Sequence, residues 1–271
     1  MAKNNFEYLY GPVYSWRLGY SLGIDPISTA QKVCNFNCVY CQLGPTRKLI
    51  RIRKIFVPTQ EIIKEIKALP KVRIDYLTFS GNGEPTLAKN LGEMIKGIRK
   101  IRKEKIAVIT NSALIYRRDV QKDLALADFV LAKIDAYAEE DFRKINRPVR
   151  GTQLKTILEG IADFKSNYNG KLALQIMFVE ENKKYAGEIA RLVREINPDE
   201  VQLNTALRPC GVKPLPKKEL ESLKIYFSRL PVISVYDVKE NLDFPQKEEV
   251  VPFNERDTIR RHGDFRKKAS A

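Results

Sequence analysis

Three cysteines, Cys34, Cys38 and Cys41, stand within eight residues of one another in the spacing C-x3-C-x2-C. Three thiolates are one too few for a structural zinc site, which usually takes four ligands. They are also one too few for an electron-transfer iron–sulfur cluster, which four thiolates normally hold. They can hold three corners of a [4Fe–4S] cube and leave the fourth iron open. An open iron can bind a substrate or a cofactor.

Two other kinds of site could use part of this run. Half of a zinc ribbon would need a second C-x2-C pair, which the sequence lacks, and the one histidine, His262, stands far from the motif. A catalytic thiol pair would use C-x2-C at the start of a helix, which leaves Cys34 without a role. We therefore predict an open-iron [4Fe–4S] cluster on Cys34, Cys38 and Cys41.

The chain is strongly basic. Its 48 Lys and Arg residues outnumber its 33 Asp and Glu residues and give a formal net charge of +15. Basic residues are concentrated in the segments 47–54, 96–105 and 260–268. Such an excess attracts anionic partners, and RNA is the partner that it favours. The alternative is a Lys-rich surface that keeps the protein soluble.

No segment is typical of a membrane or export signal. No apolar run approaches the roughly 20 residues needed to span a bilayer, and no apolar stretch follows the first residues of the chain. We therefore expect a cytoplasmic protein with no membrane partner. In that reducing compartment the cysteines remain thiols or metal ligands.

Segments rich in β-branched residues alternate with longer amphipathic segments along the 271 residues. We expect strands over 21–27, 74–79, 106–110, 129–134, 172–179 and 200–203, and an edge strand over 232–236. We expect helices over 59–69, 91–103, 118–125, 154–164, 185–195 and 217–227.

Six β/α units in strict alternation predict an α/β fold with a parallel sheet and outer helices. Right-handed crossovers curl such a sheet toward a barrel, and six units fall short of the eight in a closed barrel. We predict a partial (β/α)6 barrel with an open side over residues 1–238, and a basic C-terminal extension over 239–271. A doubly wound sheet is the alternative.

The residues with chemical potential follow the predicted strands at their carboxyl ends. They are the cysteine run after the first strand, Gly81, Asn82, Gly83 and Glu84 after the second, Asn111 and Ser112 after the third, Lys133 and Asp135 at the end of the fourth, and Arg208 and Cys210 after the sixth. Because the carboxyl ends of parallel strands meet at one edge of the sheet, we expect these residues to share one site.

Each of these groups also has a plain structural explanation. The segment 81–84 could be an ordinary β-to-α turn. Asn111 and Ser112 could cap a helix, and Lys133 and Asp135 could form an internal ion pair. Cys210 could be a small loop residue, or it could touch the substrate or donate a hydrogen atom to it.

The chain resembles the radical S-adenosylmethionine (radical SAM) superfamily. The superfamily signature, C-x3-C-x-aromatic-C, is met by Cys34, Cys38, Tyr40 and Cys41. The resemblance extends over residues 8 to 210, to a small branch grouped with the wyosine-base synthases that modify tRNA. The segments that carry it are 10–13, 17–19, 21–25, 41–44, 80–87, 132–136, 145–148 and 201–204.

The resemblance implies a radical SAM partial barrel whose three cysteines bind a [4Fe–4S] cluster, with S-adenosylmethionine (SAM) at the open iron. A one-electron reductant such as flavodoxin or ferredoxin would reduce the cluster, and a 5′-deoxyadenosyl radical would abstract a hydrogen atom from the substrate. The backbone of Tyr40 would lie near the adenine, and Gly81, Asn82, Gly83 and Glu84 would hold the methionyl ammonium, with Glu84 as its counter-charge. Asn111, Ser112, Lys133 and Asp135 would reach the ribose or the carboxylate.

One departure from that branch bears on the substrate. The wyosine synthases carry a further set of cysteines for a second cluster, whereas here only Cys210 lies outside the motif, so a second three-cysteine cluster cannot form. Three functions remain open: a radical SAM enzyme acting on tRNA or another RNA, a radical SAM activase or small-molecule enzyme, and a non-catalytic iron–sulfur sensor or binding module.

Overall fold

A single sheet of eight strands organises the computed structural model, which describes residues 6–237. The strands are β1 Leu9–Ser15, β2 Gly19–Ile24, β3 Tyr76–Phe79, β4 Lys105–Thr110, β5 Phe129–Lys133, β6 Lys171–Phe178, β7 Glu200–Thr205 and β8 Val232–Ser234. They lie in the order β1 to β8. β1 pairs with β2 antiparallel, and all the other pairs are parallel.

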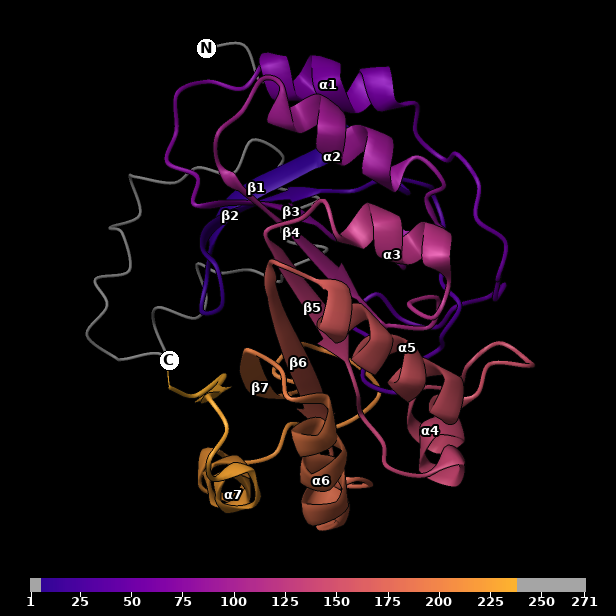
Figure 1. Ribbon diagram of the computed structural model, residues 1–271, viewed down its shortest axis with the longest axis vertical. Coiled ribbons are helices and arrows are strands. Elements are labelled where there is room, and N and C mark those ends of the chain that lie inside the picture. Colours follow the sequence, from indigo (N-terminus) through magenta and orange to yellow (C-terminus); the bar gives the residue numbers. More distant parts are fainter. Residues whose placement is uncertain (1–5, 238–271) are drawn as a thin grey trace.

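Helices cover the outer side of the curled sheet, from α1 at the top of Figure 1 to α6 and α7 at the bottom. They are α1 Thr59–Lys67, α2 Leu91–Arg99, α3 Arg118–Leu124, α4 Glu139–Ile145, α5 Leu154–Asn167, α6 Ala186–Ile196 and α7 Lys217–Ser222, with 3-10 turns at Pro85–Leu87, Lys183–Tyr185 and Leu223–Phe227. Each buries the apolar stripe that its sequence period creates, such as Ile62 and Ile66 on α1 and Ile189 and Val193 on α6.

The predicted partial barrel is confirmed. Strands β2 to β7 are each followed by a helix that leads to the next parallel strand, which gives the six expected units, and the edge strand expected over 232–236 is β8. Among the described residues, the strand order runs from β1 to β8 without a β8–β1 pair, so the sheet is an open half-barrel.

The sequence reasoning missed two elements and overextended others, such as the helix expected over 91–103, which ends at Arg99. β1 was missed because Gly11 and Pro12 interrupt its pattern, and such residues are typical of edge strands and bulges. α4 is only seven residues long. The helix expected over 217–227 ends at Ser222 and continues as a 3-10 turn. The extension over 239–271, with His262 and the basic run 260–268, lies outside the described residues, so this domain division stays a prediction.

The curl of the sheet separates two apolar layers. The main core lies between the sheet and the helices and includes Leu77, Phe79, Ile106 and Leu174. A smaller cluster fills the inside of the half-barrel, where Leu18, Ala107, Phe129, Leu131 and Ala173 meet. Most of these inner residues belong to the amino halves of their strands, so the inner space toward the carboxyl ends is left to polar side chains.

Within residues 6–237, no helix combines the length and the apolar character that crossing a bilayer would demand.

Candidate functional site

The cysteine loop is held across the carboxyl edge of the sheet by backbone hydrogen bonds to two other loops. Val33 N donates to Asn82 O at 2.9 Å, and Glu84 N donates to Val33 O at 3.1 Å. On the other side, Val149 N donates to Asn35 O at 2.8 Å. The loop is therefore tied both to the β3–α2 connection and to the α4–α5 connection, as a strand-end site requires.

Two glycines allow the β3–α2 connection to approach so closely. Gly83 has φ +154°, and a Cβ atom on it would lie 1.6 Å from Val33 O. Gly81 has φ +140°, and a Cβ atom there would lie 2.4 Å from the carboxyl carbon of Asp25. A side chain on Gly83 would push this connection away from the cysteine loop, and one on Gly81 would push it away from Asp25.

Each of the three loop cysteines receives a hydrogen bond from a side-chain nitrogen. The distances to sulfur are 3.5 Å from Asn111 Nδ2 to Cys34, 3.6 Å from Asn146 Nδ2 to Cys38, and 3.0 Å from Lys32 Nζ to Cys41. These donors come from three separate parts of the chain. Donors aimed at sulfur stabilise the thiolate form and tune the potential of a cluster bound to it.

Burial acts on the cysteines in the opposite direction. It raises the pKa of Cys34, with the nearby Glu84 carboxylate as the second cause. It also raises the pKa of Cys38 to about 11, with Asp135 as the second cause. Both groups are therefore neutral thiols in the metal-free protein at pH 7, and a metal centre must displace their protons when it binds.

The thiol set fits a [4Fe–4S] cube. Cys34, Cys38, Cys41 and Cys210 are all free thiols, and three of them share one loop whose sulfurs face nitrogen donors. Within residues 6–237, no three His, Cys, Asp or Glu side chains converge on a point that could hold one metal ion. A cube places each thiolate on a different iron, so its cysteines need no common point.

Glu84 lies beside the cysteine loop as a buried carboxylate. It is 1% exposed and accepts hydrogen bonds from Thr86 N and Oγ1 at 3.0 and 2.6 Å, from Thr110 Oγ1 at 2.6 Å, and from Asn111 N at 2.7 Å. Burial raises its pKa, and these donors oppose the shift. No Lys or Arg of the described residues pairs with it. This buried carboxylate could therefore pair with a cationic group of a ligand.

Asp135 is the centre of a second buried network. Tyr40 donates its hydroxyl proton to this carboxylate, and Asn146 Nδ2 and Met177 N donate to it at 2.7 and 2.8 Å. Lys133 Nζ lies 3.5 Å from it and 4.7 Å from the centre of the Tyr40 ring. Lys133 and Asp135 thus form the internal ion pair that was the alternative explanation, and their contact with SAM stays a prediction.

Asn111 and Ser112 do not cap a helix, because α3 begins only at Arg118. Asn111 instead links two parts of the site: its backbone N–H reaches Glu84, while its side chain reaches Asn35 at 2.6 Å and Cys34. Ser112 adopts a positive φ of 70° and accepts a hydrogen bond from Lys133 N at 2.9 Å. Ser112 thus joins the loop after β4 to the end of β5, and this link helps to fix the positions of the residues in the site.

Cys210 joins an apolar cluster beside the cysteine loop. It packs, as Cys38 does, against the cluster that contains Tyr40, Ile145 and Val179, and its thiol donates to Val212 O at 3.3 Å. The fold therefore brings this cysteine to the same apolar cluster as Cys38, although it follows Cys41 by 169 positions. This placement keeps open a contact of Cys210 with the substrate.

The sequence reasoning did not assign a role to Lys32 or Asn146, which the structure places on the cysteine sulfurs. Asn146 lies in the segment 145–148 that carries part of the family resemblance, which could have drawn attention to it. Lys32 is a cation two residues before the first cysteine, where a partner for a thiolate could have been sought.

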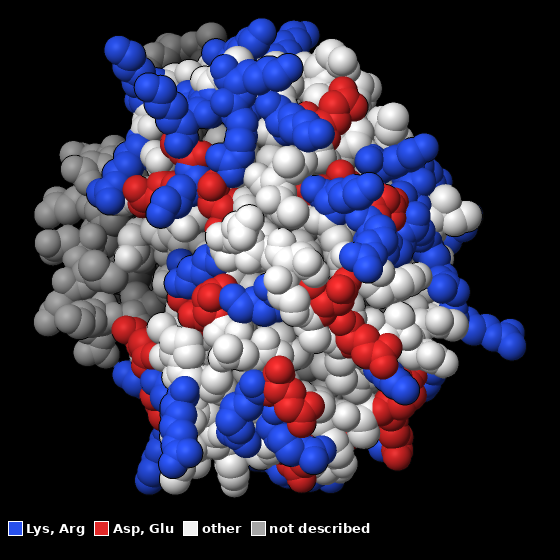
Figure 2. All heavy atoms as spheres, viewed as in Figure 1, with Lys and Arg blue, Asp and Glu red and all other residues white. Residues whose placement is uncertain are grey.

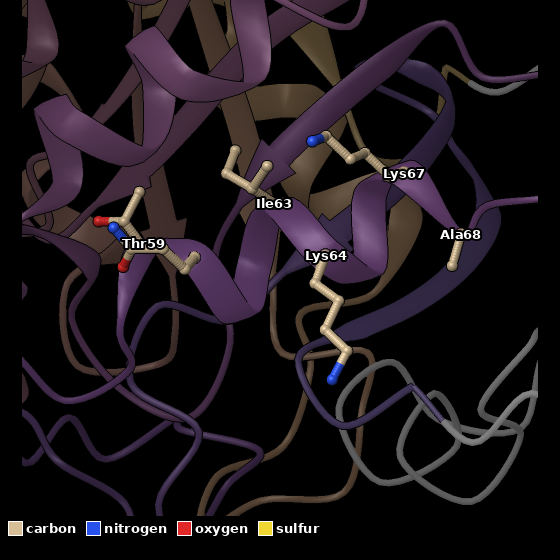
Figure 3. Close-up of a pocket in the computed structure, with 6 residues that line it drawn as sticks. Thr59, Ile63, Lys64, Lys67 and Ala68 are labelled. Carbon is tan, nitrogen blue, oxygen red and sulfur yellow. The ribbon is translucent and has the colours of Figure 1, made fainter.

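A hollow in the surface beside α1 is unrelated to this site (Figure 3). Its lining comes from one helix and its end: Thr59, Gln60, Ile63, Lys64, Lys67 and Ala68. None of these residues lies at the carboxyl end of a strand, and none is among the predicted site residues. We assign no function to it.

Comparisons with known proteins agree with the geometry. The family model described as the radical SAM superfamily matches residues 29–193. The UPF0026 protein slr1464 of Synechocystis sp. is 44% identical over 217 residues, which cover 80% of each chain.

Two solved structures share the fold. Streptococcus suis SuiB bound to the precursor peptide SuiA matches with a TM-score of 0.60 and 12% identity, over 75% of this chain and 47% of SuiB. Archaeal TYW1 matches with a TM-score of 0.53 and 16% identity, over 76% of this chain and 70% of TYW1. The chain thus spans about half the length of SuiB, and likeness at these identities shows the fold alone.

Proposed function

The chain belongs to the radical SAM superfamily, and we propose that Cys34, Cys38 and Cys41 hold its [4Fe–4S] cluster and leave one iron for SAM. The protein is a radical SAM enzyme, with the cluster and SAM as cofactors. The observation that carries the assignment of the cysteines is that each sulfur accepts a hydrogen bond from a side-chain nitrogen.

Held by these cysteines and given one electron by a protein such as flavodoxin or ferredoxin, the cluster would supply the electron for cleavage of SAM to methionine and a 5′-deoxyadenosyl radical, which would take a hydrogen atom from the substrate. The residues of this chain orient the cofactor. Glu84 is the counter-charge for the methionyl ammonium, and Gly81, Asn82 and Gly83 present the backbone beside it.

The other proposed contacts with SAM come from the cysteine loop and from residues at the carboxyl ends of the strands. The backbone of Tyr40 would lie near the adenine, and Asn111, Ser112, Lys133 and Asp135 would reach the ribose or the carboxylate. The apolar cluster around Tyr40, Ile145 and Val179 limits the access of water to this part of the site. The cytoplasm keeps thiols reduced, and it is the compartment that we propose for this protein.

Reductive cleavage of SAM tests the activity. Protein reconstituted with iron and sulfide without oxygen, then supplied with dithionite and SAM, is expected to form 5′-deoxyadenosine, measured by liquid chromatography and mass spectrometry. Because only a reduced cluster can supply the electron, samples without dithionite should form none. Protein that binds a cluster yet never forms 5′-deoxyadenosine would be a sensor or binding module.

A cluster of exposed basic side chains favours RNA as the substrate. Next to the cysteine loop lie five cationic residues that we call the basic rim: Arg47, Lys48, Arg51, Arg147 and Arg150. The rim adjoins the loop through backbone hydrogen bonds of Ile50 N to Cys34 O at 3.1 Å and of Asn37 N to Arg147 O at 3.2 Å.

The charges of the rim are not neutralised within the described residues. None of its five side chains forms an ion pair with a carboxylate there, whereas some other exposed basic residues do, such as Lys144 with Glu140 at 2.6 Å. Figure 2 shows Lys and Arg side chains gathered over α1 and α2 as well, on the helical face. The rim is the basic surface that borders the site, so it is where a polyanion would dock.

RNA binding at the rim predicts a strong dependence on salt. For single strands, the slope of log K against log salt is about −0.7 per phosphate contact. A variant with Arg47, Lys48 and Arg51 changed to Gln should lose roughly two units of that slope, measured by filter binding of tRNA. Lys144→Gln, which removes a paired charge, is the control and should bind as the parent does. If the parent, the triple variant and Lys144→Gln all show the same slope, the rim is not the surface that binds RNA.

A further inference from the structure

One of the three cysteine sulfurs lies against a positive charge. Lys32 Nζ donates to Cys41 Sγ at 3.0 Å and to Gly44 O at 2.9 Å. The donors to the other two sulfurs are the neutral side-chain amides of two asparagines. Of the three donors, Lys32 therefore brings a full charge to the sulfur that it contacts, and the other two bring a dipole.

The position of this ammonium group is fixed from both sides. The O atom of Asn82 accepts from the backbone N–H of the residue after Lys32 at 2.9 Å, and Asn82 Nδ2 donates to Thr29 O. At the other end, Gly44 N donates to Cys41 O at 3.0 Å, which holds Gly44 O beside the sulfur as the second acceptor of the ammonium. The lysine side chain is thus held at the sulfur and does not extend into solvent.

No acidic side chain competes with the sulfur for this charge. Within residues 6–237, Lys32 forms no ion pair with a carboxylate. The two buried carboxylates of the site have other donors: Glu84 accepts from the backbone of Asn111, and Asp135 accepts from the side chain of Asn146. The contact of Lys32 with Cys41 is partly buried, so solvent and salt screen it less than a charge on the surface.

A cation at this sulfur makes a bound cluster easier to reduce. Three thiolates outweigh the positive charge of a [4Fe–4S] core, so an incoming electron adds to a group that is already anionic. Net charge and hydrogen bonds to the sulfurs are among the factors that set the potential of such a cluster. The reduced form bears one more negative charge than the oxidised form, so a nearby cation stabilises the reduced form more.

We propose that Lys32 is a positioning residue that raises the reduction potential of the cluster through the sulfur of Cys41. Its charge favours the transfer of one electron from a carrier protein to the cluster, and it has no contact with the substrate in this role. The inference rests on the proposed function, since it concerns the cluster of that site.

Three variants separate the charge of Lys32 from its hydrogen bond. Lys32→Arg keeps the charge, Lys32→Gln removes the charge but keeps an N–H donor, and Lys32→Met removes both. Each protein is reconstituted with iron and sulfide without oxygen and, in the absence of SAM, titrated with dithionite and mediator dyes. Electron paramagnetic resonance measures the reduced cluster at each potential.

The loss of charge should lower the reduction potential. At a fixed potential, the ratio of reduced to oxidised cluster should fall about tenfold in Lys32→Gln and Lys32→Met, which equals a shift of about 59 mV for one electron. Lys32→Arg should stay close to the parent. Lys89→Gln removes an exposed charge just before α2 and, as the control, should titrate as the parent does.

Midpoint potentials of Lys32→Gln and Lys32→Met equal to that of the parent would overturn the proposal. If both of these variants lose their iron while Lys32→Arg keeps it, the positive charge stabilises the anionic cluster, as proposed. If Lys32→Arg loses its iron as well, the contact depends on the shape of the lysine and not on its charge, and the proposal fails.

The formation of 5′-deoxyadenosine by the parent separates this proposal from the proposed function. If the parent cleaves SAM and the neutral variants titrate as it does, only the role of Lys32 is refuted. If the parent holds no cluster, or holds one and never cleaves SAM, the proposed function itself fails.

Discussion

Replacing Cys38 by alanine should remove the cluster and abolish the formation of 5′-deoxyadenosine. Three thiolates leave no spare ligand, so two cannot retain a cube whose fourth iron is already open. We expect iron to fall from about four atoms per chain to near zero after reconstitution without oxygen. Iron and sulfide assays, the visible absorption spectrum and product analysis measure these changes. Cys34→Ala and Cys41→Ala should behave in the same way.

Cys210→Ala is the matched control. Cys210 lies in the same apolar cluster as Cys38 but is not part of the three-cysteine loop, so its variant should keep both the iron and the cleavage of SAM. A Cys38→Ala protein that retained a full cluster and normal activity would refute the assignment. So would a Cys210→Ala protein that lost its iron.

Replacing Gly83 by alanine should separate the two loops that form the site. The added Cβ atom would lie 1.6 Å from Val33 O, at a φ of +154° that other residues rarely adopt. Relief of this clash breaks the hydrogen bonds that join Val33 to Asn82 and Glu84, and it shifts the adjacent Cys34. We expect the free energy of unfolding to fall by about 3 kcal/mol or more, measured with urea. The iron content should also fall.

Gly44→Ala separates backbone strain from the clash. Gly44 also has a positive φ, of 76°, but a Cβ atom there would meet nothing within 4 Å. It should cost about 1–2 kcal/mol, from the left-handed backbone alone. If Gly83→Ala were no more destabilised than Gly44→Ala, the close approach of the two loops would not be what holds the site together.

The sequence revealed most of the cofactor site because its chemistry is encoded locally. The spacing of Cys34, Cys38 and Cys41 alone implies an open cluster, and the alternation of strands and helices places segment 81–84 and Asn111 at the same edge. The strand β1 escaped notice because Gly11 and Pro12 disturb the pattern on which strand prediction depends.

The supporting contacts could not be read from the sequence because they depend on how distant segments meet. Asn146 donates to Cys38 across 108 positions of the chain. Apart from its place in the segment 145–148 of the family resemblance, nothing in its local sequence indicates that contact. Arg17, in the turn between β1 and β2, lies within hydrogen-bond distance of the Gln175 amide on β6 only because the sheet curls around its inner side. Curvature of this kind is a property of the whole sheet.

The response of the reduced cluster to SAM tests the central claim most directly. Protein reconstituted with ⁵⁷Fe, reduced with dithionite and mixed with SAM is examined by electron paramagnetic resonance and Mössbauer spectroscopy. We predict a [4Fe–4S] cluster in which one iron differs from the other three and changes its spectrum when SAM is added. A single metal ion per chain, or a cluster whose spectrum does not change when SAM is added, would contradict the account.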